Sequence, residues 1–256
     1  MNPHLCRIVL RPRNPFEVFD LTWRFLRERG RPVLRMAAIT VLPAWVVLGL
    51  AAWLSGGHWA VGVATLLVAP LVRSPFTLLA GRLLFADEVR LRDVLWGLLR
   101  RLPALLLTAG VILGGWALAS LTCFALTPLT RGVHLWLPET ALLERVPARR
   151  GTRRAARLAG GQVGTAAVGV IAEVALTVWG GLAGEAIGQA LVGFVLQLGQ
   201  PFGSLLSIQV TPYVVGGVLL VQPIYAIYRL LLYVDARTRQ EGWDLQVGLR
   251  AAGLAR

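Results

Sequence analysis

One acidic residue inside a long apolar stretch is the strongest candidate for chemistry in this chain of 256 residues. Glu173 shares positions 158–228 with a single other charged residue, Glu185. An ionisable group in an apolar helix costs at least about 2.5 kcal/mol on membrane insertion, so such groups mark ion pairs, proton relays or substrate paths. Arg73 and Arg131 are the basic residues expected to pair with Glu173. The three form a candidate intramembrane polar site, and pairing for packing alone stays open.

The residue types that enzymes use are present without the spacing that their chemistry needs. His4, His58 and His134 are isolated, and Cys6 lies far from Cys123, so neither a zinc site nor a disulfide is expected. The nucleophile-elbow and phosphate-loop motifs are missing from the sequence. We therefore expect a non-enzymatic protein without metal or cofactor.

A proline lies next to one member of the candidate polar site. Arg73-Ser74-Pro75 falls within a helix expected over residues 59–80. Proline removes a backbone hydrogen bond and kinks a helix. Interrupted helices line substrate sites in transporters, but they also occur where neighbouring groups satisfy the freed backbone.

The composition identifies the environment in which these residues must be positioned. The chain is 56% hydrophobic and 15% charged, whereas soluble domains carry about a quarter charged residues. Residues 36–72 and 102–130 contain no charged residue. Runs of this length suit membrane-spanning helices of about 20 residues. The composition thus excludes an ordinary soluble enzyme, a disordered chain and a fibrous protein.

The net charge of +13 indicates orientation in a membrane rather than nucleic-acid binding. All 26 basic residues are arginine, and 25 of them fall in four clusters, at residues 1–35, 73–101, 145–157 and 229–256. Basic residues concentrate on the cytoplasmic side of membrane proteins. If all four clusters are cytoplasmic, an even number of crossings separates each cluster from the next.

This parity predicts an all-α polytopic membrane bundle of about six spans with both termini in the cytoplasm. The expected spans are residues 33–55, 59–80, 103–119, 124–143, 164–181 and 212–233. A single span over 103–126 is the alternative to the third and fourth, and it would leave six arginines outside. Residues 186–207 are expected as an external interfacial or re-entrant helix. The domains are then a cytoplasmic arm (1–32), a transmembrane bundle (33–234) and a cytoplasmic tail (235–256).

Two segments have the pattern of helices that lie on the cytoplasmic membrane surface. Asn14-Pro15 is a typical helix start. Phe16, Phe19, Trp23 and Leu26 follow at spacings of three and four, so they share one helix face. Residues 87–101 repeat this mixture of apolar and charged positions.

Two groups of charged residues are candidate contact sites on the cytoplasmic side. The first is a cluster expected to engage anionic lipid headgroups or an acidic partner protein, formed by Arg149, Arg150, Arg153, Arg154 and Arg157. The second is a tail of alternating charges expected to dock on the other cytoplasmic clusters and lock the bundle, formed by Asp235, Arg237, Arg239, Glu241 and Asp244.

Two stretches resemble a group of bacterial polytopic membrane proteins similar to the membrane domain fused to some glycerophosphodiester phosphodiesterases. The first is Leu137-Pro-Glu-Thr-Ala-Leu-Leu-Glu144 with the arginine-rich Arg153–Gly160, and the second is Tyr228–Leu245, which contains Tyr-Val-Asp-Ala-Arg-Thr-Arg-Gln-Glu-Gly-Trp-Asp-Leu. The resemblance implies a six-helix bundle with the hairpin at 103–143. It implies no activity, and the phosphodiesterase catalytic domain is not present in this sequence.

The expected function is that of a structural or accessory protein of the bacterial inner membrane. Its partners are the bilayer and, through the arginine-rich face, anionic lipid or another protein. The alternative is a small transporter, channel or lipid-handling protein with Glu173 and the proline-containing second helix lining a path.

Overall fold

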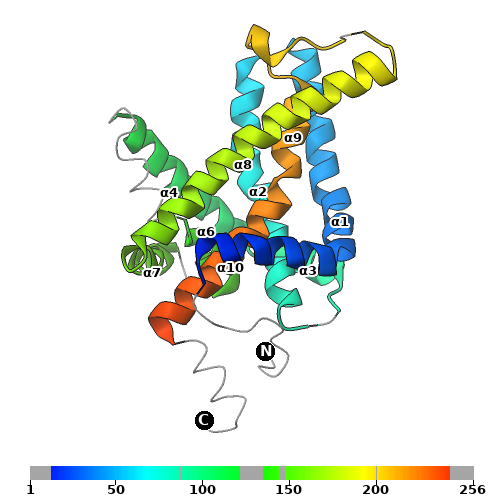
Figure 1. Ribbon diagram of the computed structural model, residues 1–256. Helices are drawn as coiled ribbons and strands as arrows, with labels where there is room; N and C mark the ends of the chain where they lie inside the picture. Colours follow the sequence, from blue (N-terminus) through cyan, green and yellow to red (C-terminus); the bar gives the residue numbers. More distant parts are fainter. Residues whose placement is uncertain (1–12, 87, 122–134, 145–147, 200, 243–256) are drawn as a thin grey trace. The chain divides into compact units, whose positions relative to one another are not determined.

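The computed structural model describes residues 13–86, 88–121, 135–144, 148–199 and 201–242, and all regular elements among them are helical (Figure 1). The α-helices are α1 (Pro15–Leu54), α2 (Trp59–Leu83), α3 (Leu91–Leu99), α4 (Leu102–Leu121), α6 (Leu137–Leu143), α7 (Ala148–Gly160), α8 (Val163–Ala190), α9 (Pro212–Leu220) and α10 (Gln222–Glu241). A π-helix, η2 (Leu191–Val195), and a 3₁₀-helix, η3 (Leu205–Ser207), complete the set.

Four of these helical segments are long and apolar enough to cross a membrane. They are Pro15–Leu54, Trp59–Leu83, Val163–Val195 and Pro212–Glu241. Helices α3 and α4 make a fifth if the pair, bent by 63°, is a single span. Many large apolar side chains on these helices are exposed, including Val47, Leu54, Trp179 and Ile187. Contact with lipid explains such exposure, so the all-α, membrane-type fold that the composition predicts is confirmed at this level.

The helices form two compact units that are each described separately. Unit 1 contains the described residues of Met1–Glu28, Ser74–Ile171 and Ala226–Arg256. Unit 2 contains Arg29–Arg73 and the described residues of Ala172–Tyr225. Helices α1, α2, α8 and α10 therefore contribute residues to both units.

Close backbone contact between α8 and α9 organises unit 2. A Cβ atom added to Gly184 would lie 2.5 Å from the carbonyl oxygen of Tyr213 and 2.7 Å from Cα of Gly217. Gly180 meets Gly217 in the same way. Helices can approach this closely only where neither carries a side chain, which is a frequent arrangement in membrane bundles.

The segment between η2 and α9 is fastened by one carboxylate of unit 2. Glu185 accepts hydrogen bonds from the Thr211 hydroxyl, from the Leu205 backbone N–H at 3.1 Å and from the Gln189 amide at 3.0 Å. The Val210 N–H donates to the Gly57 carbonyl at 2.8 Å, which ties this segment to the turn between α1 and α2.

Unit 1 has its hydrophobic core where α6, α7, α8 and α10 meet. The fully buried Trp136 and Leu137 precede and begin α6, and Ala155, Leu158 and Tyr233 pack with them. On the other side of α10, Tyr228 makes an edge-to-face contact with Phe19 of α1, with ring centroids 5.7 Å apart. These contacts place the arginine-rich α7 and the end of α10 on the same core.

The helix expected in the cytoplasmic arm and the first expected span are joined in one helix, α1. This helix is interrupted at a single residue. Arg29 has non-helical angles of φ −120° and ψ 25°. Pro32 accounts for the break, because it lacks the N–H that would bond to the Glu28 carbonyl and its ring crowds that oxygen.

The expected helix over residues 124–143 is not continuous. Residues 124–134 lie outside the described part of the chain, Leu135 and Trp136 form a turn, and α6 begins only at Leu137. Pro138 favours a helix start at this point, because the N–H it lacks has no partner in the first turn. Helix α4 contains the expected third span.

The separate helix expected over residues 186–207 is wrong. Helix α8 continues to Ala190 and η2 carries the helical path to Val195, after which the described chain is irregular up to η3. The positive φ angles of Gln197 (53°) and Gly199 (71°) mark the end of this path, since the right-handed helix requires negative φ.

Two prolines in expected spans have different effects. The span 212–233 is divided at Val221 into α9 and α10, since Pro223 cannot donate the next helical hydrogen bond. Helix α2, in contrast, is not interrupted at Pro75. Residues 72–80 are all buried, and this packing holds the helix together across the missing bond.

Replacing Gly184 with alanine is expected to lower the midpoint of thermal unfolding in detergent. The added Cβ would press on backbone atoms of α9, and overpacking of this kind costs about 1–3 kcal/mol. Gly164→Ala is the matched control in the same helix, because a Cβ there meets no atom within 4 Å. Equal midpoints for the two variants would contradict the close contact.

Candidate functional site

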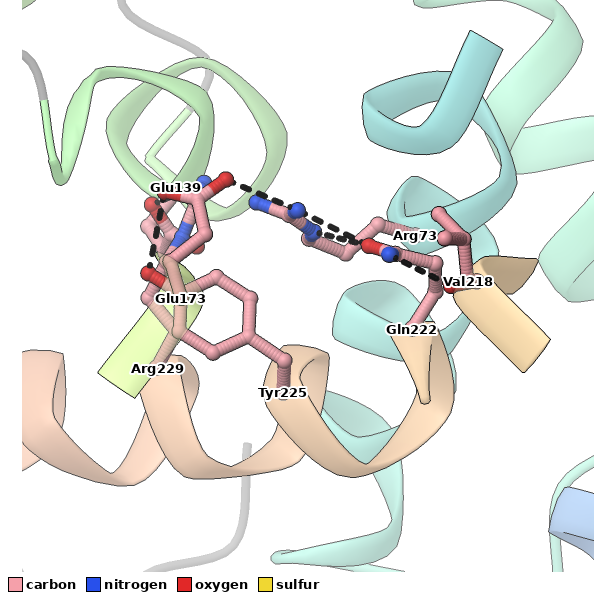
Figure 2. Close-up of polar contacts among 7 residues, drawn as sticks. All are labelled: Arg73, Glu139, Glu173, Val218, Gln222, Tyr225 and Arg229. Carbon is pink, nitrogen blue, oxygen red and sulfur yellow. Dashed lines mark hydrogen bonds and ion pairs between the residues drawn. The ribbon is translucent and has the colours of Figure 1, made fainter. Parts of the chain in front are cut away.

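Arg73 of α2 is the centre of a polar cluster within unit 2, and Figure 2 shows its side chain directed toward α8 and the start of α10. The Arg73 Nε and Nη2 atoms donate to Oε1 of Gln222 at 3.0 and 2.8 Å. Nη2 also lies 2.9 Å from Oε1 of Glu173. The guanidinium carbon stands 4.4 Å from the centre of the Tyr225 ring. Arg73, Glu173, Gln222 and Tyr225 are called the Arg73 cluster below.

The Arg73 cluster is almost closed to solvent. Arg73, Gln222 and Tyr225 expose 4%, 1% and 1% of their surfaces, and the Glu173 side chain exposes 17%. The second carboxylate oxygen of Glu173 accepts a hydrogen bond from the Tyr225 hydroxyl at 3.4 Å. Within this cluster, the positively charged Arg73 contacts the negatively charged Glu173.

The break between α9 and α10 positions two of these residues. Gln222 and Tyr225 are three residues apart at the start of α10, so they lie on one face of that helix. The Gln222 amide nitrogen reaches back to the Val218 carbonyl at 2.9 Å, an oxygen close to the break. The Gln222 side chain thus donates from its nitrogen to a carbonyl near the end of α9 and accepts hydrogen bonds from Arg73 with its oxygen.

The contacts of Arg73 determine what the cluster can do chemically. A buried charge is tolerated when an opposite charge and hydrogen bonds compensate it. Arg73 has an ion pair, two hydrogen bonds and an aromatic ring around its guanidinium, so its charge is compensated inside the protein. This geometry favours a role in holding helices together. Arg131, the other expected partner of Glu173, lies outside the described residues.

A second buried ion pair lies within unit 1. Arg229 of α10 contacts Glu139 of α6 through two parallel bonds, from Nε to Oε1 at 2.5 Å and from Nη2 to Oε2 at 2.8 Å (Figure 2). The side chains expose 7% and 0%. A bidentate arginine–carboxylate pair has the strongest geometry available to these groups.

Sequence reasoning missed the Glu139–Arg229 pair and the role of Gln222. In the sequence, Arg229 belongs to the terminal arginine cluster, and Glu139 lies in a stretch that stands out only for its family resemblance. A signal was present, because Arg229 lies inside an apolar run that ends at Val234, and Glu139 is flanked by apolar residues. The sequence indicates that Glu139 and Arg229 each need a partner of opposite charge. It does not indicate which partner, because the chain contains several candidates for each.

The end of α10 joins a network of charges around Glu144, called the tail network. Glu144 accepts a hydrogen bond from the Tyr233 hydroxyl and contacts the guanidinium of Arg154 on α7. Arg237 lies 3.6 Å from Glu144 and 2.9 Å from Glu241. Glu241 also lies 2.8 Å from Arg154. The network thus connects α7, the residue after α6, and α10.

Asp235 makes a separate connection from α10 to the beginning of the described chain. It lies 2.8 Å from Arg239 and accepts the Arg13 backbone N–H at 2.7 Å. Arg239 in turn donates to the Arg13 carbonyl at 2.5 Å. Four of the five proposed tail residues therefore contact other charged or polar groups, and Asp244 lies outside the described residues.

The arginine side chains of α7 point in different directions. Arg154 points toward the tail network, where burial disfavours its charge, but the hydrogen bond and charge of Glu144 and the charge of Glu241 outweigh this and raise its pKa above the ordinary value. Arg150, Arg153 and Arg157 are exposed, and they form no ion pair within the described chain. We call these three the α7 arginine face. The side chain of Arg149 lies outside the described part.

The opposite side of α7 explains why the arginine face is fixed in place. Gly151, Ala155, Leu158 and Ala159 are buried in the core of unit 1. The exposed arginines follow one another at spacings of three and four, which places them on one face of the helix.

The described residues contain no group of three or more His, Cys, Asp or Glu side chains arranged to hold a metal ion. His4, His134, Cys6 and Cys123 lie outside the described residues. Comparisons of the chain with protein-family models, curated proteins and solved structures find no match. The fold and the site define the class as an all-α protein with several helices of membrane-spanning character and buried ion pairs.

Asp235→Ala is expected to lower the midpoint of thermal unfolding in detergent. Its carboxylate exposes 5% and holds both Arg239 and the Arg13 N–H, and hydrogen bonds to charged groups contribute about 1.5–3 kcal/mol. Glu241→Ala is expected to act in the same direction through the tail network.

The control is Glu28→Ala, which removes an exposed pair with Arg24 that contributes at most about 0.5 kcal/mol. If Asp235→Ala and Glu241→Ala unfolded at the same temperature as Glu28→Ala, the tail would not lock the fold.

Proposed function

We propose that this chain is a non-enzymatic, multi-pass protein of the bacterial inner membrane that engages anionic lipid headgroups through the α7 arginine face. Its role is structural or accessory. The observation that carries the proposal is the exposure of Arg150, Arg153 and Arg157 on a helix whose other side is buried. Cations held on one helix face, without an ion pair among the described residues, are suited to a surface of negative charge.

The energetics favour a membrane surface as the target of this face. Each arginine near an anionic leaflet contributes about 1 kcal/mol of attraction, and the effect falls off within a Debye length. Three arginines held on one helix face reach the same surface together, so their contributions combine without the entropy cost of ordering a loose segment. An acidic partner protein is the alternative ligand.

The distribution of arginines supports an orientation with both termini in the cytoplasm. The orientation requires an even number of crossings between clusters. The four long segments would give two crossings between the first and second clusters and two between the third and fourth. Between the second and third clusters, α4 would then cross only if another span follows it. We propose six spans, as the parity and the resemblance to the bacterial membrane-protein group both favour.

The Arg73 cluster supports the accessory role over the transport alternative. A substrate path requires a charge that a substrate can approach, but Arg73 is surrounded by groups of the protein itself. The Glu139–Arg229 pair is likewise enclosed. These two buried ion pairs thus support a stabilising role, whereas Arg150, Arg153 and Arg157 are exposed together on α7.

The triple variant Arg150→Gln/Arg153→Gln/Arg157→Gln tests this function. Phosphatidylglycerol added to the detergent-solubilised protein should raise the unfolding midpoint of the wild type above that in phosphatidylcholine, because a ligand that binds the folded state stabilises it. The triple variant should lose most of this increment.

The matched control is Arg31→Gln/Arg35→Gln/Arg92→Gln, which removes three exposed arginines outside α7 and should keep most of the increment. An equal response to phosphatidylglycerol in the wild type and the α7 variant would refute the proposal. A wild type that does not respond at all would point to a protein partner for α7.

A further inference from the structure

The first part of α1 exposes a second face whose chemistry differs from that of α7. Phe16 and Trp23 expose 74% and 46% of their surfaces, and Asp20 and Arg27 are also exposed. Their spacings of four, three and four residues place them along one stripe of the helix. We call these four residues the α1 outer face.

The other side of the same segment is fully used within unit 1. Val18, Thr22 and Phe25 expose 1%, 0% and 8%, and Phe19 packs edge-on against Tyr228. The segment is therefore held by its inner side, and on the outer face Phe16 is largely exposed while Trp23 touches the edge of Phe19, with ring centroids 6.2 Å apart, and stays 46% exposed. Of the four residues expected near one face, Phe16 and Trp23 are exposed, whereas Phe19 and Leu26 are partly buried.

The acidic residues lead this segment and the basic residues follow, with one further acidic residue, Glu28, at its end. Glu17 and Asp20 lie in the first half, whereas Arg24 and Arg27 lie in the second. Glu28 follows and pairs with Arg24 at 2.9 Å, but both side chains stay more than half exposed. Such a balanced segment gains little from an anionic leaflet, which attracts net positive charge.

The pattern is complementary to itself when two copies run in opposite directions. An antiparallel pair centred at position 22 places Asp20 opposite Arg24 of the second copy. A parallel pair would set like charges side by side.

Membrane symmetry favours the same antiparallel arrangement. Two copies inserted with the same orientation form a twofold dimer whose axis is normal to the bilayer, and such an interface uses the same patch of both copies. The segment is expected from its sequence to lie along the membrane surface. A helix in that plane meets its symmetry mate in the antiparallel direction.

We propose that the α1 outer face binds the same face of a second copy of this chain, antiparallel, to form a homodimer. Phe16 and Trp23 supply the apolar contact, and the two charged halves set direction and register. Tryptophan and arginine are the residue types most often found at the centres of protein interfaces. The proposal is independent of lipid binding by α7.

The test measures Förster transfer between donor- and acceptor-labelled full-length chains reconstituted together in phosphatidylcholine vesicles, which carry no anionic lipid. The wild type should show transfer above that of an unrelated membrane protein at the same density. Asp20→Arg alone and Arg24→Asp alone should each lose it, because like charges then face each other.

Two combinations restore the opposite charges and make the test specific. Donor-labelled Asp20→Arg mixed with acceptor-labelled Arg24→Asp should recover transfer, as should the double variant Asp20→Arg/Arg24→Asp. Unfolding midpoints of all variants check that each remains folded. The α7 triple variant should keep wild-type transfer, which separates the dimer from lipid binding.

The proposal is overturned if the wild type shows only background transfer, or if Asp20→Arg transfers as well as the wild type. It is also overturned if both single variants lose transfer but their mixture does not recover it, because the charges would then not face each other in the dimer.

Discussion

An arginine in a long apolar helix needs a partner within the protein, and this requirement underlies the structure. Arg73 in α2 and Arg229 in α10 are both enclosed, and each is joined to a carboxylate of another helix. Removing one partner of such a pair leaves an uncompensated charge and costs about 3–5 kcal/mol. The pairs therefore fix which helices are neighbours within each unit, whereas apolar packing alone is less selective about its partners.

This requirement separates two groups of described arginines, those that are engaged by carboxylates and those on the exposed side of α7. Arg73, Arg154 and Arg229 are engaged by carboxylates and are part of the scaffold. Arg150, Arg153 and Arg157 are exposed on a helix whose opposite side is in the core. The functional proposal rests on the second group, because these three charges are exposed together on one face of a helix whose other side is buried. The proposed binding of anionic lipid and the anchoring of the fold thus involve different residues of the same helix, α7.

Helix type and approximate position were predictable from composition, since charge-free runs of this length suit few other structures. The end of α1 at Leu54 and the start of α2 at Trp59 agree with the expected spans 33–55 and 59–80. The positions of breaks were less predictable. Pro223 divides a helix, but Pro75 does not, because buried packing around α2 compensates for the missing hydrogen bond. The local sequence does not reveal this packing, because it depends on residues elsewhere in the chain.

The two charged members of the candidate site were predictable from sequence, but its uncharged members and most of its connections were not. Glu173 and Arg73 stand out as charges in apolar stretches, and the structure places them 2.9 Å apart. Gln222 does not stand out, because an uncharged amide is tolerated in many positions and its role depends on the break beside it. Glu139 and Arg229 are 90 residues apart, and no periodicity relates residues at that distance.

A double-mutant cycle on Arg73 and Glu173 tests the central claim that this buried ion pair stabilises the bundle. The free energy of unfolding is measured in detergent for the wild type, Arg73→Met, Glu173→Gln and the double variant. Each single variant should be destabilised, and the double variant should lose less than the sum, with a coupling energy of about 1–3 kcal/mol. Additive losses within about 0.5 kcal/mol would contradict the account, because the two side chains would then act independently.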